Sequence, residues 1–289
     1  MNDTTVRGTI ERKRWLDARA RAVTQFADVA SLISPISAEI DARLDLLAFE
    51  PERILLIGAW DDGLAPKLLA RYPQSELWLV DMVDGFIELA QKNLKNNNKI
   101  KYLKSEDLPL PCADATVDLL VSAVSLPPYW HWQTFLAECR RVLRPKGYLS
   151  LATIGERSLA EVRAAGEEFG LGSVVHEFID IGSLGMALVA AGFADPVVDR
   201  EWMSASYSNL KSFRRDLKNL GAINCRQDRS RGLGPKTRLR LWQEYLFVPQ
   251  TRVSITAEVL YAQGFAPTGF APKRVSRTEQ VLPFPRRQP

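Results

Sequence analysis

The chain has 289 residues, of which 46% are hydrophobic and 25% are charged, a composition typical of a soluble globular protein with one large domain or two small ones. It contains no run of about 18 apolar residues, which argues against a transmembrane helix, and its polar start has no apolar signal core. Cys112, Cys139 and Cys225 lie far apart and form no CxxC pair, so neither a disulfide framework nor a metal site is expected. A reducing cytoplasm is the simplest location.

Charge is unevenly distributed along the chain. Residues 200–289 hold 17 lysines and arginines against 6 aspartates and glutamates, a net charge of +11, whereas residues 1–199 hold 21 against 28, a net charge of −7. A basic C-terminal third suits an acidic partner, such as a nucleic acid, a phosphate-bearing substrate or an acidic carrier protein. The alternative is an ordinary solvated surface.

Hydrophobic periodicity predicts alternating helices and strands in the first half of the chain. The elements expected are helices within 9–48, a buried strand at 53–57, a helix at 64–72, a strand at 75–84, a helix at 85–97, strands within 99–111 and 116–126, and a helix, turn and strand over 132–155. This alternation indicates an α/β fold with a doubly wound, mostly parallel sheet. Ligands of such sheets bind at the carboxyl ends of the strands, here at loops 58–63, 81–84, 105–109 and 122–130.

After Gly155 the pattern changes. The elements expected there are helices at 158–169, 176–193, 208–221 and 237–246, strands at 195–207 and 252–267, and an Arg/Gly loop at 226–236. The tail 268–289 is rich in proline and arginine and is expected to be disordered.

The four loops carry residues suited to a nucleoside-type cofactor. Gly58 ends the first strand and allows close approach of the ligand to the backbone. Asp81 ends the second strand, where a carboxylate binds ribose hydroxyls, and Asp107 with Leu108 follows the third strand, where an acid and an apolar wall suit adenine. Met82 and Ser122, at the ends of the second and fourth strands, complete the predicted cofactor site. The alternatives are a strand-end cap for Asp81 and a solvated loop for Asp107.

This order of motifs resembles the class I S-adenosylmethionine-dependent methyltransferases, whose fold is Rossmann-like. The segment SEDLPLPCADATVDLLVSAVSL, followed by FLAECRRVLRPKGYLSLATIG, is similar to their LPF…FDLV…RVLKPGG region. Further segments, GERSLAEVRAA and EFIDIGSLGMALVAAGFADPVVDREWMSASY, resemble the malonyl-acyl-carrier-protein O-methyltransferases of biotin synthesis, and the similarity spans roughly residues 20–267. A related branch, the mitochondrial complex I assembly factors, shares some of these features.

The resemblance implies S-adenosyl-L-methionine as cofactor and methyl transfer to the free carboxylate of a malonyl thioester on acyl carrier protein. It divides the chain into an N-terminal helical segment (1–50), a cofactor-binding core (51–155), a substrate- and carrier-binding part that completes the sheet (156–267) and the tail. Because a carboxylate is already a nucleophile, proximity and alignment can supply most of the catalysis, and no dedicated base is required.

Several positions depart from the family pattern. Trp60 and Asp62 replace the second and third glycines of the first loop, and Leu56 replaces an acid in the first strand. A tyrosine is missing from the stretch after Phe26, and a histidine is missing from the stretch that begins at Asp180. Each lost charged hydrogen bond weakens binding by about 1.5–3 kcal/mol, or roughly 10- to 100-fold. The alternative function is therefore a methyltransferase-fold protein that has lost or altered cofactor use and acts in binding or assembly.

Two residues are candidates for work on the acceptor. His131, among aromatic residues after the fourth strand, is expected to position the substrate or handle protons, and the alternative is a packed polar residue. Arg163 is expected to bind the malonyl carboxylate, and the alternative is a surface arginine. His176 is expected to be structural.

The basic C-terminal third is expected to dock the acidic carrier protein, and neither nucleic acid nor membrane is expected as a partner. The residues predicted for the docking patch are Arg214, Arg215, Lys218, Arg226, Arg229 and Arg231. A nucleic-acid methyltransferase is a weaker alternative, because LPPYW at 126–130 has leucine where an Asn-Pro-Pro-Tyr motif has the asparagine that binds a base amine.

Overall fold

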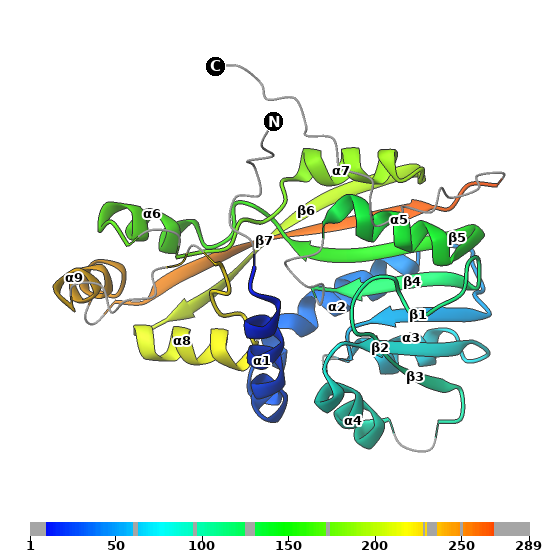
Figure 1. The fold of residues 1–289 in the computed structure, drawn as a ribbon, viewed down its shortest axis with the longest axis horizontal. Coiled ribbons are helices and arrows are strands. Elements are labelled where there is room, and N and C mark those ends of the chain that lie inside the picture. Colours follow the sequence, from blue (N-terminus) through cyan, green and yellow to red (C-terminus); the bar gives the residue numbers. More distant parts are fainter. Residues whose placement is uncertain are drawn as a thin grey trace.

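A computed structural model describes residues 10–59, 63–94, 97–124, 131–171, 174–227, 229, 236–248 and 251–268. Seven described strands form one sheet in the order β3-β2-β1-β4-β5-β7-β6 (Figure 1). Their bounds are β1 Arg53–Ile57, β2 Glu76–Asp81, β3 Ile100–Lys104, β4 Val117–Ala123, β5 Leu143–Ile154, β6 Ala194–Tyr207 and β7 Val253–Phe265. The first five strands are parallel, and β7 runs antiparallel to both β5 and β6. The predicted α/β class with a mostly parallel sheet is confirmed.

Helices cover both faces of the sheet, and alternate strand residues point to opposite faces. Leu56 packs in a buried cluster with residues of α2 to α4, whereas its neighbour Leu55 packs in a second cluster with residues of α5 and α7. Burial on both faces explains why the parallel strands read as continuous apolar runs. The helices are α1 Arg12–Ala22, a 3-10 helix Val23–Asp28, α2 Ala30–Leu44, α3 Leu64–Arg71, α4 Asp84–Asn93, α5 Trp132–Val142, α6 Ala160–Glu168, α7 Ile181–Ala190, α8 Leu210–Asn219 and α9 Lys236–Leu246.

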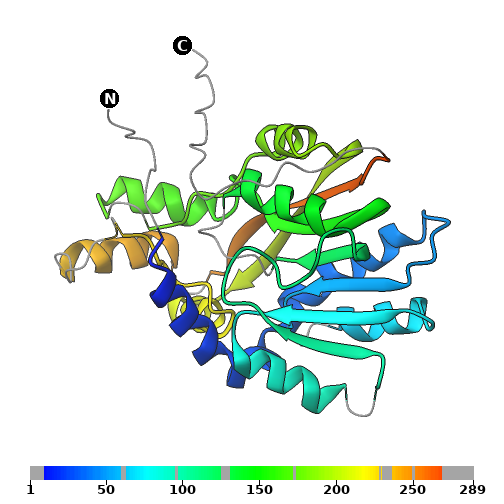
Figure 2. The same ribbon diagram turned by 45° about the vertical axis from the view of Figure 1, so that its right-hand side comes forward.

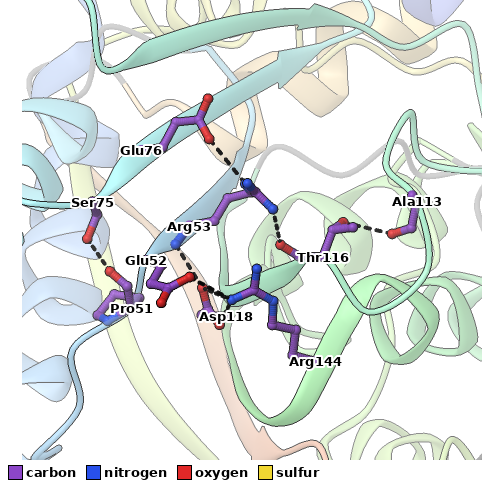
Figure 3. Close-up of polar contacts among 9 residues, drawn as sticks. All are labelled: Pro51, Glu52, Arg53, Ser75, Glu76, Ala113, Thr116, Asp118 and Arg144. Carbon is purple, nitrogen blue, oxygen red and sulfur yellow. Dashed lines mark hydrogen bonds and ion pairs between the residues drawn. The ribbon is translucent and has the colours of Figure 1, made fainter.

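The amino ends of the parallel strands are joined by a polar network centred on Asp118 (Figure 3). The Asp118 carboxylate accepts the backbone N–H of Arg53 at 2.8 Å and a guanidinium N–H of Arg144 at 3.0 Å. Arg53 in turn pairs with Glu76 at 3.1 Å and donates to the carbonyl of Thr116 at 2.8 Å. These contacts hold β1 against β2 and β4 at the edge of the sheet opposite the predicted cofactor loops.

Strands β6 and β7 extend beyond β5, and α6, α8 and α9 lie around their extended ends (Figure 1). β5 pairs with β7 only from Tyr148 opposite Phe265 to Ile154 opposite Val259, whereas β6 and β7 stay paired as far as Tyr207 opposite Val253. A third buried cluster forms on this extension between α6, α8 and α9, and its members include Val162, Phe213 and Trp242. The part of the chain after Gly155 therefore both completes the sheet and adds a separate small core to it.

The predicted elements differ from the structure at a few boundaries. The helix predicted over 176–193 was wrong at its start, because α7 begins only at Ile181, where Asp180 caps it by accepting the backbone N–H of Ser183 at 2.9 Å. Residues 176–180 are not helical, and Ile179 forms a bridge with Gly155. Residues 269–289 of the tail and most of the loop 226–236 lie outside the described residues.

Candidate cofactor site and acceptor cavity

The carboxyl ends of β1 and β2 bring Gly58 and Asp81 together, as the sequence predicted. Gly58 has a φ of 104°, which favours glycine, and its N–H donates to the carbonyl of Val80 at 2.8 Å. The Asp81 carboxylate accepts the backbone N–H of Ala59 at 3.0 Å and that of Val83 at 2.9 Å. These bonds aim the carboxylate across the end of β1. Trp60 and Asp62 lie outside the described residues.

The other predicted cofactor residues lie at the same edge of the sheet. Ser122 is buried at the end of β4 and pairs in register with Ile57, the residue before Gly58. Met82 follows Asp81 and is partly buried. Asp107 sits in the turn after β3, where its carboxylate accepts the backbone N–H of Leu108 at 3.0 Å, and Leu108 is joined to Pro109 by a cis peptide bond.

Two arginines of α1, which the sequence analysis missed, contact the two predicted cofactor acids. Arg19 lies 3.3 Å from Asp81, and both side chains are only 3% exposed. Arg12 lies 3.0 Å from Asp107 in an exposed pair. The two arginines are seven residues apart, which places them on one face of the helix. Helix α1 lies beside α4 (Figure 2), and its two arginines reach the end of β2 and the turn after β3. The sequence signal that could have found Arg19 is its place beside Trp15, Ala18 and Ala22, which recur at helical spacing and are buried in the structure together with it.

Arg19 is set among aromatic rings as well as against a carboxylate. Its guanidinium carbon lies 4.6 Å from the centre of the Phe86 ring and 5.5 Å from that of Trp15. Burial lowers the pKa of Arg19, and the adjacent Asp81 opposes that shift. Arginine keeps its proton in proteins, so the pair is a buried ion pair.

A cavity of about 1250 Å³ adjoins this pair between the sheet, α1, α2, α6 and α8. Its apolar lining includes Val124, Phe135, Ile154, Met203 and Val259. Among the described lining residues, six are cationic, against the acids Asp28 and Glu177, and one of those six is Arg19. The cations are Arg14, Arg19, Lys211, Arg214, Arg215 and Lys218. The cavity therefore favours an anionic ligand that has an apolar or extended body.

The structure places the two acceptor candidates beside this cavity without bringing either side chain into its lining. His131 is exposed at the residue that precedes α5, and its neighbour Trp132 lines the cavity instead. Arg163 donates from Nη1 to the carbonyl of Glu156 at 2.9 Å, and its neighbour Val162 lines the cavity. Both assignments stay predictions.

The predicted docking patch is smaller than expected. Arg226 is buried and pairs with Glu177 at 3.2 Å, and Arg229 pairs with Glu11 at 2.7 Å, so both are used inside the fold. Arg231 lies outside the described residues. The exposed cations that face the cavity belong to α8, which adds Lys211 to the predicted Arg214, Arg215 and Lys218.

His176 lines the same cavity in a structural role. Its Nε2 accepts the backbone N–H of Cys225 at 2.9 Å, which requires an unprotonated nitrogen. Burial, with the nearby Arg226 cation, lowers the pKa of His176 to about 4. In the described part of the chain, no three His, Cys, Asp or Glu side chains gather as a metal site, and no helix is long and apolar enough to cross a membrane.

The strand order and the acids at the ends of β2 and β3 define the class I methyltransferase fold. Residues 56–151 match the family described as "Methyltransferase domain". The YcgJ protein of Bacillus subtilis shares the fold, with a TM-score of 0.54 at 13% identity over 80% of this chain and 99% of that one. Two relatives named malonyl-[acyl-carrier protein] O-methyltransferase are more similar in sequence. The Halorhodospira halophila enzyme is 31% identical over 93% of this chain and 91% of its own, and that of Laribacter hongkongensis is 30% identical over 91% and 92%. The chain belongs to this family of S-adenosylmethionine-dependent methyltransferases.

The strand-end residues fit the cofactor of this family if Arg19 gives up its hydrogen bond to the Asp81 carboxylate. A carboxylate offers about four lone-pair positions. The N–H groups of Ala59 and Val83 and the guanidinium of Arg19 use three positions on Asp81. Two ribose hydroxyls therefore need the remaining position and the one that Arg19 holds. Asp107 carries an exposed ion pair with Arg12, which a ligand displaces at little cost.

Proposed function

We propose that the chain methylates the free carboxylate of a malonyl thioester on acyl carrier protein, as a step in making the biotin precursor. The observation that carries this proposal is the cavity beside Asp81, whose described lining holds more cations than acids. An anionic acceptor is thereby drawn to the edge of the cofactor site. The names of the relatives support malonyl-carrier protein as the acceptor.

The chain's own residues contribute binding and alignment. Asp81 would hold the ribose and Asp107 the adenine, while Gly58 leaves room for the backbone to approach the cofactor. The bound cofactor supplies an electrophilic methyl group. The acceptor carboxylate is already an anion, so holding it in line with that methyl group is the main requirement, and no base has to remove a proton.

Charge also provides a way to release the product. The acceptor enters a cationic cavity as a carboxylate and leaves as a neutral ester, so the attraction that bound it disappears when the methyl group is transferred. The carrier protein is expected to dock on α8, because Lys211, Arg214 and Lys218 are exposed at the cavity and suit an acidic surface and a phosphate-bearing arm. We place the reaction in the cytoplasm, because Cys112, Cys139 and Cys225 are free thiols.

Methyl transfer tests the function directly. The protein is incubated with S-adenosylmethionine and either malonyl-carrier protein or acetyl-carrier protein, which lacks the free carboxylate. The mass of malonyl-carrier protein is expected to rise by one methylene group, while that of acetyl-carrier protein stays unchanged. No mass change with either carrier would count against the proposal.

A second candidate is a methyltransferase-fold protein that acts in binding or assembly. The observation in its favour is that α1 arginines contact both cofactor acids, one of them in a buried pair. This candidate predicts that the wild-type chain has the methyltransferase fold but does not bind the cofactor. A measurable affinity for S-adenosylhomocysteine would rule it out in this form.

A further inference from the structure

Arg19 connects the cofactor edge to the acceptor cavity. Its guanidinium contacts Asp81, the predicted ribose acid, at 3.3 Å, and the same residue lines the cavity. Of the six cations in the described lining, it is the one paired with a cofactor acid. The side chain is almost fully buried, so it is also the cation least screened by solvent.

Arg19 is placed to hold a carboxylate between the two sites. The acceptor carboxylate would have to reach from the cavity to the cofactor, and Arg19 both lines the cavity and contacts the predicted ribose acid. The other cations of the lining are engaged elsewhere or exposed. Arg14 donates to the carbonyl of Asn224 at 3.0 Å, and the four cations of α8 are exposed.

Burial favours a second anionic partner for Arg19 when the cofactor is bound. Ribose hydroxyls take up the Asp81 position that Arg19 holds in the free protein. A buried guanidinium that loses a carboxylate contact is strongly disfavoured unless another anion replaces it. An acceptor carboxylate at the inner end of the cavity meets this need, because a guanidinium binds a carboxylate through two parallel hydrogen bonds.

We propose that Arg19 binds the carboxylate of the acceptor, and that its ion pair with Asp81 is the resting contact that this carboxylate replaces once the cofactor is bound. The inference rests on the proposed function, because it assumes a carboxylate acceptor. Because the acceptor carboxylate compensates the guanidinium that the cofactor displaces from Asp81, each ligand favours the binding of the other.

Arg12 provides a matched control on the same helix. It lies two turns from Arg19 on the same face and also pairs with a predicted cofactor acid, Asp107, but it is exposed and does not belong to the described cavity lining. A change at Arg12 therefore loosens α1 over the cofactor site without removing a cation from the acceptor cavity.

The test is calorimetric titration of protein saturated with S-adenosylhomocysteine, using malonyl-coenzyme A and acetyl-coenzyme A as probes. The two probes share the phosphate-bearing arm and differ in the free carboxylate. The wild type is expected to prefer the malonyl probe by roughly 10- to 100-fold, the range for a hydrogen-bonded charge. Arg19→Met is expected to abolish this preference and leave the affinity for the acetyl probe unchanged, while Arg12→Ala keeps the preference.

Arg19→Lys is the second variant, because it retains the buried charge and keeps the test valid even if Arg19→Met fails to fold. It loses the two-pronged contact, so the preference should fall at least threefold. A full malonyl preference in Arg19→Lys or Arg19→Met overturns the assignment of Arg19 and leaves the proposed function intact. Equal binding of both probes by the wild type instead overturns the proposed function.

Discussion

Arg19 and Asp81 come from segments 62 residues apart and form a buried ion pair between the N-terminal helix and the end of β2. Breaking such a pair by removing one partner leaves a buried charge without compensation, which typically costs 3–5 kcal/mol. We therefore expect Asp81→Asn to lower the free energy of unfolding by about 3 kcal/mol in urea titrations. Arg12→Ala, which breaks the exposed pair with Asp107, should cost less than about 1 kcal/mol.

A double-mutant cycle checks that the loss comes from the pair. Arg19→Met with Asp81→Asn removes both charges, so the loss in the double variant should be smaller than the sum of the single losses by at least about 1 kcal/mol. Additive losses would mean that the two residues stabilise the fold independently of each other.

His176 predicts a pH dependence of stability. Its pKa is about 4 in the folded chain, below the usual value of about 6.5, so the unfolded chain binds the proton more readily between these values. The contribution of His176 is fully present above pH 6.5 and is lost as the pH falls towards 4, by at most about 1.4 kcal/mol per pH unit. Urea midpoints at pH 7 and pH 5 should therefore differ less in His176→Gln than in the wild type, and an equal difference would contradict the assignment.

Asp118 is expected to stabilise the sheet without affecting the cofactor site. Its carboxylate accepts hydrogen bonds from Arg53 and Arg144 at the amino edge of the strands, opposite Gly58 and Asp81 (Figure 3). Asp118→Ala should lower the free energy of unfolding by about 2 kcal/mol, because it removes bonds to a charged group, while the affinity for S-adenosylhomocysteine stays unchanged.

The control for this variant is Glu52→Ala. Glu52 contacts the same Arg144 at 3.1 Å, but its side chain is 82% exposed, so the loss should be below about 0.5 kcal/mol. A loss of cofactor affinity in Asp118→Ala would show that the two edges of the sheet are coupled.

Gly155 is expected to tolerate no side chain. A Cβ there would lie 2.5 Å from Oε2 of Glu258, a buried carboxylate that is held by the backbone N–H of Arg157 at 3.0 Å. Gly155→Ala should therefore destabilise the fold by about 1–3 kcal/mol. Gly185 in α7 is the matched position, because its Cβ would meet Val198 at an ordinary 3.7 Å, and Gly185→Ala should be neutral or stabilise by up to about 1 kcal/mol. Thermal unfolding of both variants distinguishes the two environments, and equal shifts would contradict this account.

The parts of the site that follow strand ends could be predicted from sequence. Gly58, Asp81 and Ser122 each end an apolar strand, and parallel strands bring such positions to one edge, so their proximity follows from local patterns. Arg19 could not be placed in this way, because its contact with Asp81 depends on how α1 lies over the sheet. Arg226 was assigned to the surface from its charge, but Glu177 neutralises it inside the fold.

The position of α7 shows the same limit at the level of secondary structure. Residues 176–180 have helix-compatible spacing, yet they lie outside α7, where Ile179 forms a bridge with Gly155 and His176 accepts the backbone N–H of Cys225. Tertiary contacts outweighed local propensity there.

We expect the edge formed by Gly58, Asp81 and Asp107 to bind the cofactor even though α1 contacts both acids. Calorimetric titration of the wild-type protein with S-adenosylhomocysteine tests this expectation most directly. We predict a dissociation constant near the micromolar range, which corresponds to a binding free energy of about −8 kcal/mol. Arg12→Ala should bind more tightly, because it has lost one ion pair that competes with the cofactor for Asp107. No heat of binding at ligand concentrations of about 1 mM would contradict the expectation, because it would mean that the contacts of α1 with Asp81 and Asp107 exclude the cofactor.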